Sequence, residues 1–278
     1  MRLIDVRHLG RERVIGCWEA DGVLIDPGPS SSLGTLLAEL GDEPPRALLL
    51  THIHLDHAGA AGTLVRRWPH LHVHVHERGA PHLADPSRLL ASAQRLYGDR
   101  MEELWGEVAP VPGENLRPLV GGEEVLGVRV AYTPGHASHH VSYLHEDSGR
   151  AFVGDVAAVR IPPSGFVLPP TPPPDIDLEA WERSLDLVGE WQPASIGLTH
   201  FGAVEEPPAH LELVRRRLRE QARRAREGGP EEFERELRRQ VAAAGDKGTA
   251  AALLQAVPPE QQYLGLERYW RKRAETAE

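Results

Sequence analysis

The sequence has 278 residues, of which 41% are hydrophobic and 26% are charged, as is typical of a soluble globular protein with a large buried core. Its formal net charge of −10 argues against general nucleic-acid binding. Cys17 is the only cysteine, which excludes an internal disulfide, and the lack of a signal peptide or long apolar span predicts a cytoplasmic protein with no membrane segment.

The first half of the chain is predicted to alternate between short strands and helices. The predicted strands cover residues 3–9, 14–18, 23–25, 47–50 and 71–76, and the helices cover residues 32–40 and 60–68. Residues 82–107 form a predicted helical insert, which Gly98 and Asp99 divide into two helices. This insert would lie over one edge of the strands and form a wall of a pocket.

The second half begins with strands and ends with helices. Strands are predicted at residues 125–132, 141–145, 151–153 and 194–198, with a helix at 177–190 that Asp177 caps. Between them, residues 161–174 form a loop too rich in proline for regular structure. Long loops of this kind usually shape the access to a site.

From about residue 205 the composition changes and the chain is helical by pattern. The predicted helices cover residues 208–227, 230–244, 249–256 and 258–274. We therefore expect a body formed by residues 1–204 and a C-terminal helical extension, residues 205–278, that packs on it. An apolar stripe supports this packing, with a homodimer contact as the alternative; its residues are Tyr263, Leu266, Tyr269 and Trp270.

Candidate metal-binding side chains are concentrated in the segment from Thr51 to Ala58, whose sequence is Thr-His-Ile-His-Leu-Asp-His-Ala. It follows a buried strand, so it lies where the chain turns at the edge of a sheet. In extended backbone His52 and His54 point the same way, and a turn at Leu55 brings Asp56 and His57 to the same edge. Imidazole and carboxylate groups bind zinc and similar metals, so this segment predicts a metal site.

Further candidate ligands recur along the chain, each directly after a predicted strand. They are Asp26, His136, Asp155 and His200. Because the ends of these strands meet at one edge, we expect all of these side chains to lie near the histidine segment.

The ligand order resembles that of the metallo-β-lactamase superfamily over roughly residues 10–205. Within it, the glycine-rich stretch at 58–62 and the Thr-Pro-Gly-His string at 133–136 resemble glyoxalase II-like thioesterases and lactonases, and the longer string to His140 resembles an uncharacterised prokaryotic branch. The resemblance implies an α/β (α+β) fold: an αββα sandwich of two mixed sheets flanked by helices.

The resemblance also implies a role for each residue. A first metal would be held by His52, His54 and His136, and a second by Asp56, His57 and His200. Asp155 would bridge both metals, while Asp26 would orient a ligand imidazole and His140 would support the site. The expected cofactors are two divalent metal ions, zinc first, with iron or manganese as alternatives.

The implied function is a dinuclear metal-dependent hydrolase that acts on a small thioester, ester or lactone through a metal-bridging hydroxide. Asp56 and Asp155 would take part directly in catalysis, and a small molecule is the expected partner. Four residues are candidates for the substrate pocket, with core packing or a surface role as the alternative for each; they are Tyr97, Tyr143, Arg160 and Phe166.

Three alternative functions remain open from the sequence. A nuclease or RNA-processing activity would use the arginines of residues 215–226 on phosphates, although interleaved glutamates favour a solvated, salt-bridged helix. An oxidoreductase similar to the superfamily's sulfur dioxygenases would use one iron, whereas two ligand sets are present here. A metal that only braces the fold would be expected in a closed four-ligand site.

Overall fold

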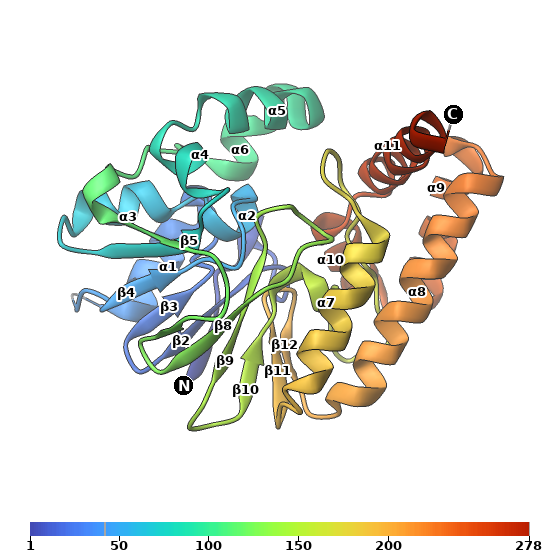
Figure 1. Cartoon of the computed structure of the whole chain (residues 1–278). Coiled ribbons are helices and arrows are strands. Elements are labelled where there is room, and N and C mark those ends of the chain that lie inside the picture. Colours follow the sequence, from blue (N-terminus) through green and yellow to red (C-terminus); the bar gives the residue numbers. More distant parts are fainter. Residues whose placement is uncertain (42, 278) are drawn as a thin grey trace.

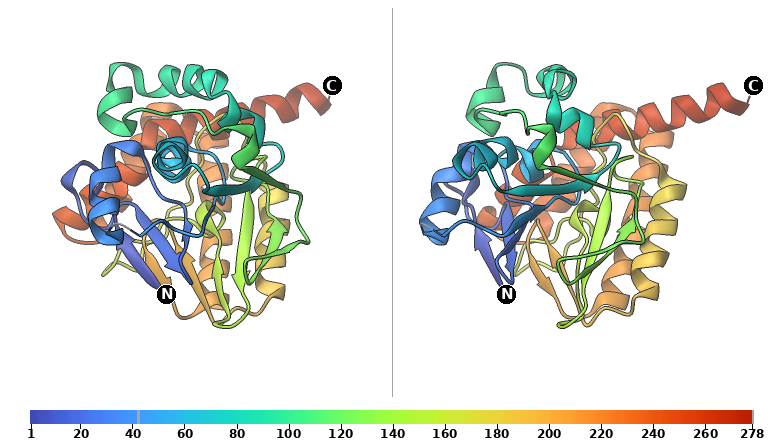
Figure 2. Two further views of the ribbon diagram at one scale, coloured as in Figure 1. Left: turned by 90° about the vertical axis from the view of Figure 1, so that its left-hand side faces the viewer. Right: turned by 60° about the vertical axis from the view of Figure 1, so that its left-hand side comes forward.

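Two β-sheets packed face to face form the centre of the molecule (Figure 1). The computed structural model describes residues 1–41 and 43–277. Helices α1 (Leu33–Leu40) and α3 (Ala61–Arg67) lie outside the first sheet, and α7 (Leu178–Glu190) and α8 (Pro207–Glu227) lie outside the second (Figures 1 and 2). The predicted αββα sandwich is therefore confirmed.

The first sheet has its strands in the order in which they occur along the chain. These are β1 (Arg2–Asp5), β2 (Gly16–Ala20), β3 (Val23–Ile25), β4 (Ala47–Leu49), β5 (His72–His76) and β6 (Leu116–Leu119). The first three pair antiparallel, whereas β3 to β6 run parallel to one another. The sheet is mixed, and the carboxyl ends of β3 and β4 meet at the edge where the histidine segment begins.

The second sheet is also mixed. Its order is β12 (Gly202–Val204), β11 (Ser195–Leu198), β10 (Arg150–Phe152), β9 (Val141–His145), β8 (Val128–Tyr132) and β7 (Glu124–Val125). Only β10 and β11 pair parallel, and both deliver their carboxyl ends to the same edge. Asp155 and His200 follow these two strands.

The space between the sheets is filled by large apolar side chains. Trp18, Ile25 and Leu49 from the first sheet pack against Tyr143 and Phe152 from the second. Each of these side chains is at most 4% exposed. This packing holds the two sheets in a fixed relation, so residues that follow strands of different sheets can share one site.

Most predicted elements are present, and the differences have local causes. The first strand ends at Asp5 rather than at residue 9, because the Asp5 carboxylate accepts hydrogen bonds from the N–H groups of Arg7 (3.0 Å) and Arg13 (2.7 Å) and turns the chain. Strands β6 and β12 were not predicted. They are four and three residues long, and β6 contains Pro118, so neither has a clear alternating pattern.

The predicted insert forms three helices above the edge that carries the candidate ligands (Figure 1). They are α4 (Ala80–Ala84), α5 (Ser87–Tyr97) and α6 (Met101–Trp105). A turn at Gly98–Arg100 divides the last two as expected, whereas α4, which begins before residue 82, is a third helix beyond the two predicted. The short helix α2 (Leu55–Ala58) lies beneath them and begins within the histidine segment.

The C-terminal helices follow the predicted pattern closely. After α8 come α9 (Pro230–Ala243), α10 (Lys247–Ala256) and α11 (Pro259–Ala277), and the end of α11 projects from the body (Figure 2). The apolar stripe on α11 packs against other parts of the same chain. Leu266 is fully buried, and Trp270 Nε1 donates a hydrogen bond to the carbonyl of Ala222. Within the described ranges, no helix is long and apolar enough to cross a membrane.

Candidate metal centre

Seven imidazole and carboxylate side chains converge at one edge of the sandwich. His52 and His54 follow β4, and α2 then turns Asp56 and His57 to the same edge. His136, Asp155 and His200 arrive from the loops after β8, β10 and β11. They fall into two groups, in each of which the ligand atoms lie within 4.8 Å of one another: His52, His54, His136 and Asp155, and Asp56, His57 and His200.

The first group surrounds a common point with its nitrogen atoms. His54 Nδ1 lies 3.0 Å from His52 Nε2 and 2.9 Å from His136 Nε2. Asp155 Oδ2 completes the group at 3.3 Å from His136 Nε2. Three imidazoles and one carboxylate oxygen are a donor set for zinc, iron or manganese.

The second group lies on the other side of Asp155. Asp56 Oδ2 lies 3.4 Å from His200 Nε2 and 3.9 Å from His57 Nε2. The second oxygen of Asp155, Oδ1, lies 3.4 Å from His57 Nε2 and 3.6 Å from His200 Nε2. One carboxylate therefore faces both groups with different oxygens, as a ligand shared by two metal ions would.

The other ring nitrogen of each of three histidines is tied to a backbone carbonyl or a carboxylate. His57 Nδ1 donates to Asp26 Oδ2 at 2.8 Å, His136 Nδ1 donates to the carbonyl of Pro170 at 2.9 Å, and His200 Nδ1 donates to the carbonyl of Val14. These acceptors place the proton on Nδ1 and leave the Nε2 lone pair free toward the centre.

Asp26 lies at 0% exposure behind the centre and belongs to neither of the two ligand groups. Its Oδ1 accepts the N–H of Thr51, and its Oδ2 accepts the hydroxyls of Thr51 (2.7 Å) and Thr199 (2.9 Å) as well as His57. The Thr51 hydroxyl donates its proton to Asp26. The same hydroxyl oxygen, Thr51 Oγ1, therefore accepts a hydrogen bond from His52 Nδ1 at 3.1 Å. Asp26 thus orients two ligand imidazoles.

Burial and mutual repulsion keep most of the imidazoles neutral, as metal binding requires. Burial, with His136 beside it, lowers the pKa of His54 to about 4, and burial also lowers the pKa of His52 and His136. His57 and His200 differ. Burial opposes their charge, but Asp155, Asp26 and Asp56 raise the pKa of His57 well above the usual range, and Asp155 and Asp56 raise that of His200.

Two buried atoms at the centre indicate whether these seven residues fit bound metal ions. His57 Nε2 and Asp155 Oδ1 are buried and have no hydrogen-bond partner among the described residues. Buried polar groups are normally paired, because an unpaired one costs about 1–3 kcal/mol. The two atoms belong to different groups and lie 3.4 Å from each other, so bound cations would satisfy them. The residues fit a dinuclear metal centre.

Two helices support the segment that carries Asp155, and a further histidine packs behind His52. Trp181 Nε1 on α7 and His210 Nε2 on α8 donate to the carbonyls of Val156 and Ala157, each at 2.8 Å. His140 lies behind His52, with ring centroids 5.1 Å apart, and its Nδ1 is bonded to the hydroxyl of Thr133. It belongs to neither of the two ligand groups.

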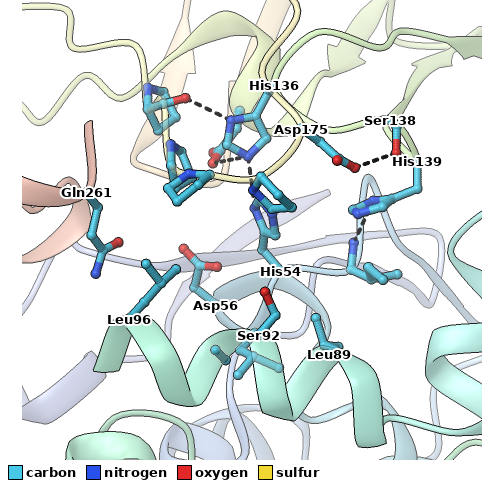
Figure 3. A pocket seen from close by; sticks show the side chains of 18 of the residues that line it. His54, Asp56, Leu89, Ser92, Leu96, His136, Ser138, His139, Asp175 and Gln261 are labelled. Atoms are coloured by element: carbon cyan, nitrogen blue, oxygen red, sulfur yellow. Dashed lines mark hydrogen bonds and ion pairs between the residues drawn. The ribbon is translucent and has the colours of Figure 1, made fainter. Parts of the chain in front are cut away.

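A cavity of about 240 Å³ opens onto the centre. Its walls come from α5, the proline-rich loop and the start of α11, and Figure 3 shows His54, Asp56 and His136 lining it opposite α5. Tyr97 is in the wall, where sequence reasoning expected it.

The other three candidates for the pocket lie elsewhere, and these expectations are corrected. Tyr143 is fully buried between the sheets and donates its hydroxyl to the carbonyl of Leu50. The Arg160 side chain borders a separate hollow beside Phe201, and Phe166 lies under the guanidinium of Arg217 at 4.9 Å. Closeness to a ligand in sequence did not bring these side chains to the cavity, because they contact other parts of the fold.

Several residues that shape the centre were missed from the sequence. Thr51 and Thr199 each precede a ligand histidine at a strand end, so the repeated Thr-His pair was a usable signal. The carbonyl of Pro170 and the side chains of His210 and Gln261 gave no such signal, because distant contacts place them.

The family model of the metallo-beta-lactamase superfamily matches residues 19–200. The chain belongs to this superfamily. The metallo-beta-lactamase fold-containing protein ST1585 of Sulfurisphaera tokodaii is 32% identical over 197 residues, which cover 68% of this chain and 71% of that protein. Its crystal structure superimposes with a TM-score of 0.70 at 24% identity, covering 95% of this chain and 97% of the other, and it shares the fold.

Two further superfamily relatives carry descriptions of chemistry. A hydroxyacylglutathione hydrolase of Xylella fastidiosa is 33% identical over 135 residues, which cover 48% of this chain and only 40% of that enzyme. The structure of TTHA1623 in a di-iron-bound form matches with a TM-score of 0.51 at 29% identity, covering 71% of this chain and 89% of the other.

Proposed function

We propose that this protein is a dinuclear metal-dependent hydrolase of a small thioester, ester or lactone. The observation that carries the proposal is the position of Asp155, whose two oxygens face two separate groups of ligand atoms. Superfamily membership agrees with a metal-dependent hydrolase. Two divalent cations, when bound there, would supply Lewis acidity that polarises a scissile carbonyl and makes water acidic enough to act at neutral pH.

The protein's own side chains would prepare this chemistry. His54, His136 and Asp155 line both the centre and the cavity, so they meet substrate and metal in the same place. Asp56, exposed to the cavity beside them, would hold the second cation on the substrate side. Asp26 and the carbonyl of Pro170 keep the imidazoles from rotating when substrate enters.

Zinc is the metal we propose first, with iron or manganese as the alternatives. Imidazole and carboxylate donors suit all three ions. TTHA1623, which has been solved with two irons, gives specific support for iron. The proposed substrate class is supported by the hydroxyacylglutathione hydrolases among the relatives and by a cavity sized for a small molecule.

We further propose a cytoplasmic protein that does not bind nucleic acid. Five of the seven arginines between residues 215 and 226, which would have to contact phosphates, are paired with acidic residues; they are Arg215, Arg217, Arg219, Arg223 and Arg224. Arg215 and Arg219 contact Glu182, and Arg224 contacts Glu220 and Glu236. A paired arginine has little charge to offer a phosphate backbone.

The test is a hydrolysis panel on protein of measured metal content, with thioesters, lactones and phosphodiesters as substrates. We expect two metals per chain and activity on a thioester, ester or lactone. Asp155→Ala should lose at least one metal and most of the activity, whereas the control Asp147→Ala, in an exposed hairpin turn, should retain both. Two bound metals without hydrolysis of any substrate would reject the proposal, and oxygen consumption with a persulfide would favour the single-iron alternative.

A further inference from the structure

A second hollow, of about 460 Å³, lies beside the segment that carries His200 and shares no lining residue with the cavity at the metal centre. Its walls come from three parts of the chain: the start of the proline-rich loop, the residues after His200, and the first two turns of α8. A volume of this size is within the range of small-molecule sites. The hollow is therefore a separate site, large enough for a small ligand.

Two residues of this hollow are held by the segments that carry metal ligands. The N–H of Arg160 donates to the carbonyl of His200 at 2.7 Å, and the carbonyl of Arg160 accepts the N–H of Phe201 at 3.3 Å. His210 Nε2 donates to the carbonyl of Ala157 at 2.8 Å. The hollow is thus built on fixed backbone, and a ligand that binds there pays little to order it.

The guanidinium of Arg160 is an unpaired cation in the wall of the hollow. The hydrogen bonds of Arg160 are made by its main chain, and within residues 1–41 and 43–277 its side chain has no acceptor. The residue is half-buried, yet its side-chain nitrogens are open to solvent rather than enclosed. Burial, with the charge of Arg160 nearby, lowers the pKa of His210 to about 4, so the guanidinium lies close to the imidazole on the same wall.

The two acidic residues that line the hollow do not pair with this cation. Glu205 pairs with Arg150 instead, at 3.7 Å from Oε1 to Nη2. Glu206 is without an ion-pair partner in the described part of the chain, and both glutamates are exposed, so water and salt screen their charges. A ligand with one negative charge would be attracted by Arg160 and repelled little, whereas a doubly charged phosphate would be repelled more by Glu206.

Most of the remaining wall is apolar. It includes Pro162, Pro163, Phe201, Val204, Ala209 and Leu213. The hydroxyl of Ser164 is also in the wall, but it already donates to the carbonyl of Ala244 and accepts the N–H of Phe166. The walls therefore favour a ligand whose uncharged part is apolar, because such a part gains by leaving water.

We propose that the hollow binds a small monocarboxylate with an apolar body, whose carboxylate pairs with the guanidinium of Arg160. A planar guanidinium matches a carboxylate with two parallel hydrogen bonds, and the apolar walls cover the rest of the ligand. The inference does not depend on the proposed hydrolase activity, since the hollow is separate from the metal centre and no bond is broken in it.

Titration calorimetry of the metal-loaded protein with benzoate tests this site. We expect saturable binding that Arg160→Gln weakens by about tenfold or more, the factor that a hydrogen bond between charged groups contributes. Benzyl alcohol, which has the ring without the charge, should bind the wild type more weakly by a similar factor. Carboxylates also bind metal ions, so Asp155→Ala provides the control for the centre: this variant should lose metal but keep the benzoate site that Arg160→Gln loses.

Three further variants separate the site from general charge effects and from folding. Arg95→Gln, at an exposed arginine of α5, should bind benzoate as the wild type does. Glu206→Gln removes a repelling charge and should tighten binding by about two- to fivefold. Arg160→Lys keeps the charge and should bind more tightly than Arg160→Gln, a comparison that still holds if Arg160→Gln proves less stable.

Several results would overturn the proposal. They are no saturable binding of benzoate, equal binding of benzoate and benzyl alcohol, an affinity unchanged in Arg160→Gln, and a loss of all benzoate binding in Asp155→Ala. Weaker binding in Glu206→Gln would also overturn it, because the carboxylate would then not lie where the charges of the hollow place it.

A second ligand identifies the source of the carboxylate. N-acetylalanylphenylalanine presents the carboxyl terminus of a peptide next to an aromatic side chain. Tighter binding of this dipeptide than of benzoate would identify a peptide terminus as the occupant, and weaker binding would identify a free small acid. In both cases Arg160→Gln should weaken the binding, and a dipeptide or benzoate that binds independently of Arg160 counts against the site.

Discussion

Asp26 is a buried side chain that orients candidate metal ligands without being one of them. Its two oxygens accept hydrogen bonds from Thr51 after β4, Thr199 after β11 and His57 on α2. These segments belong to both sheets, so the carboxylate joins the sheets directly behind the centre. The cost of burying its charge is offset because every contact is a donor.

Asp26→Asn tests this role at nearly constant volume. The amide cannot accept at both positions, so His57 loses its fixed orientation and we expect metal affinity to fall by about 10–100-fold. Competition with a chromogenic chelator measures the affinity, and Asp21→Asn, an exposed aspartate that pairs with His145, serves as the control. Unchanged affinity in Asp26→Asn would contradict the assigned role.

His210 makes stability depend on pH independently of the metal ligands. Burial lowers its pKa in the folded protein to about 4, whereas the unfolded value is 6.5. Because the folded pKa is the lower one, the unfolded chain binds more protons between these values. Stability is therefore lost as pH falls from about 6.5 to about 4, by up to about 3 kcal/mol.

His210→Gln keeps a donor for the carbonyl of Ala157 but removes the titration. We expect urea unfolding of this variant to lose less stability between pH 7 and pH 4.5 than the wild type loses. The exposed His70→Gln provides the comparison and should follow the wild type. Parallel curves for the wild type and His210→Gln would show that His210 is not the group responsible.

At the scale of elements, the centre depends on a chain of contacts that begins outside the sandwich. Helices α7 and α8 hold the turn that carries Asp155, and the proline-rich loop holds His136 through the carbonyl of Pro170. That loop is in turn pressed against α11, where a Cβ atom on Gly265 would lie 2.0 Å from the carbonyl oxygen of Thr171. The C-terminal helices thus support the site as well as bordering it.

Gly265→Ala tests the contact between α11 and the loop. The added methyl group meets backbone atoms that cannot move alone, so we expect a loss of about 1–3 kcal/mol in the free energy of unfolding, together with weaker metal retention. Gly34→Ala in α1 faces open space and should be neutral or stabilising by up to about 1 kcal/mol. Denaturant unfolding measures the free energy of unfolding of both variants. Equal values for Gly265→Ala and Gly34→Ala would show that α11 is not tightly packed against the loop at Gly265.

At the scale of the whole molecule, bound metal should contribute to stability, because the buried ligand groups are brought together only in the folded chain. At a free metal concentration of 1,000 times Kd, mass action stabilises the fold by about 4 kcal/mol for each occupied site. Removing one metal with a chelator should lower Tm by about 8–15 °C for a domain of this size, and removing both should lower it by about twice as much.

Calorimetry before and after chelation measures this change, with metal content determined on the same samples. Readdition of metal should restore Tm, and Asp155→Ala should show a smaller shift because it retains less metal. A confirmed loss of metal without any change in Tm would contradict the coupling between the centre and the fold.

The sequence by itself identified the candidate ligands, and its resemblance to a known family implied the class of fold. His52, His54, Asp56 and His57 are adjacent in the chain, and Asp155 and His200 each follow a recognisable apolar strand, so local pattern placed them at one edge. The C-terminal helices were also predictable, since their apolar spacing is regular.

Only the tertiary structure decided which distant groups meet at that edge. The bonds from Thr199 to Asp26 and from Tyr97 to Gln261 join residues 173 and 164 positions apart, and no local periodicity encodes them. For the same reason Tyr143, adjacent in sequence to the ligand strings, belongs to the core. Strand alternation sets the face on which a side chain lies, but the packing of the whole chain decides what covers that face.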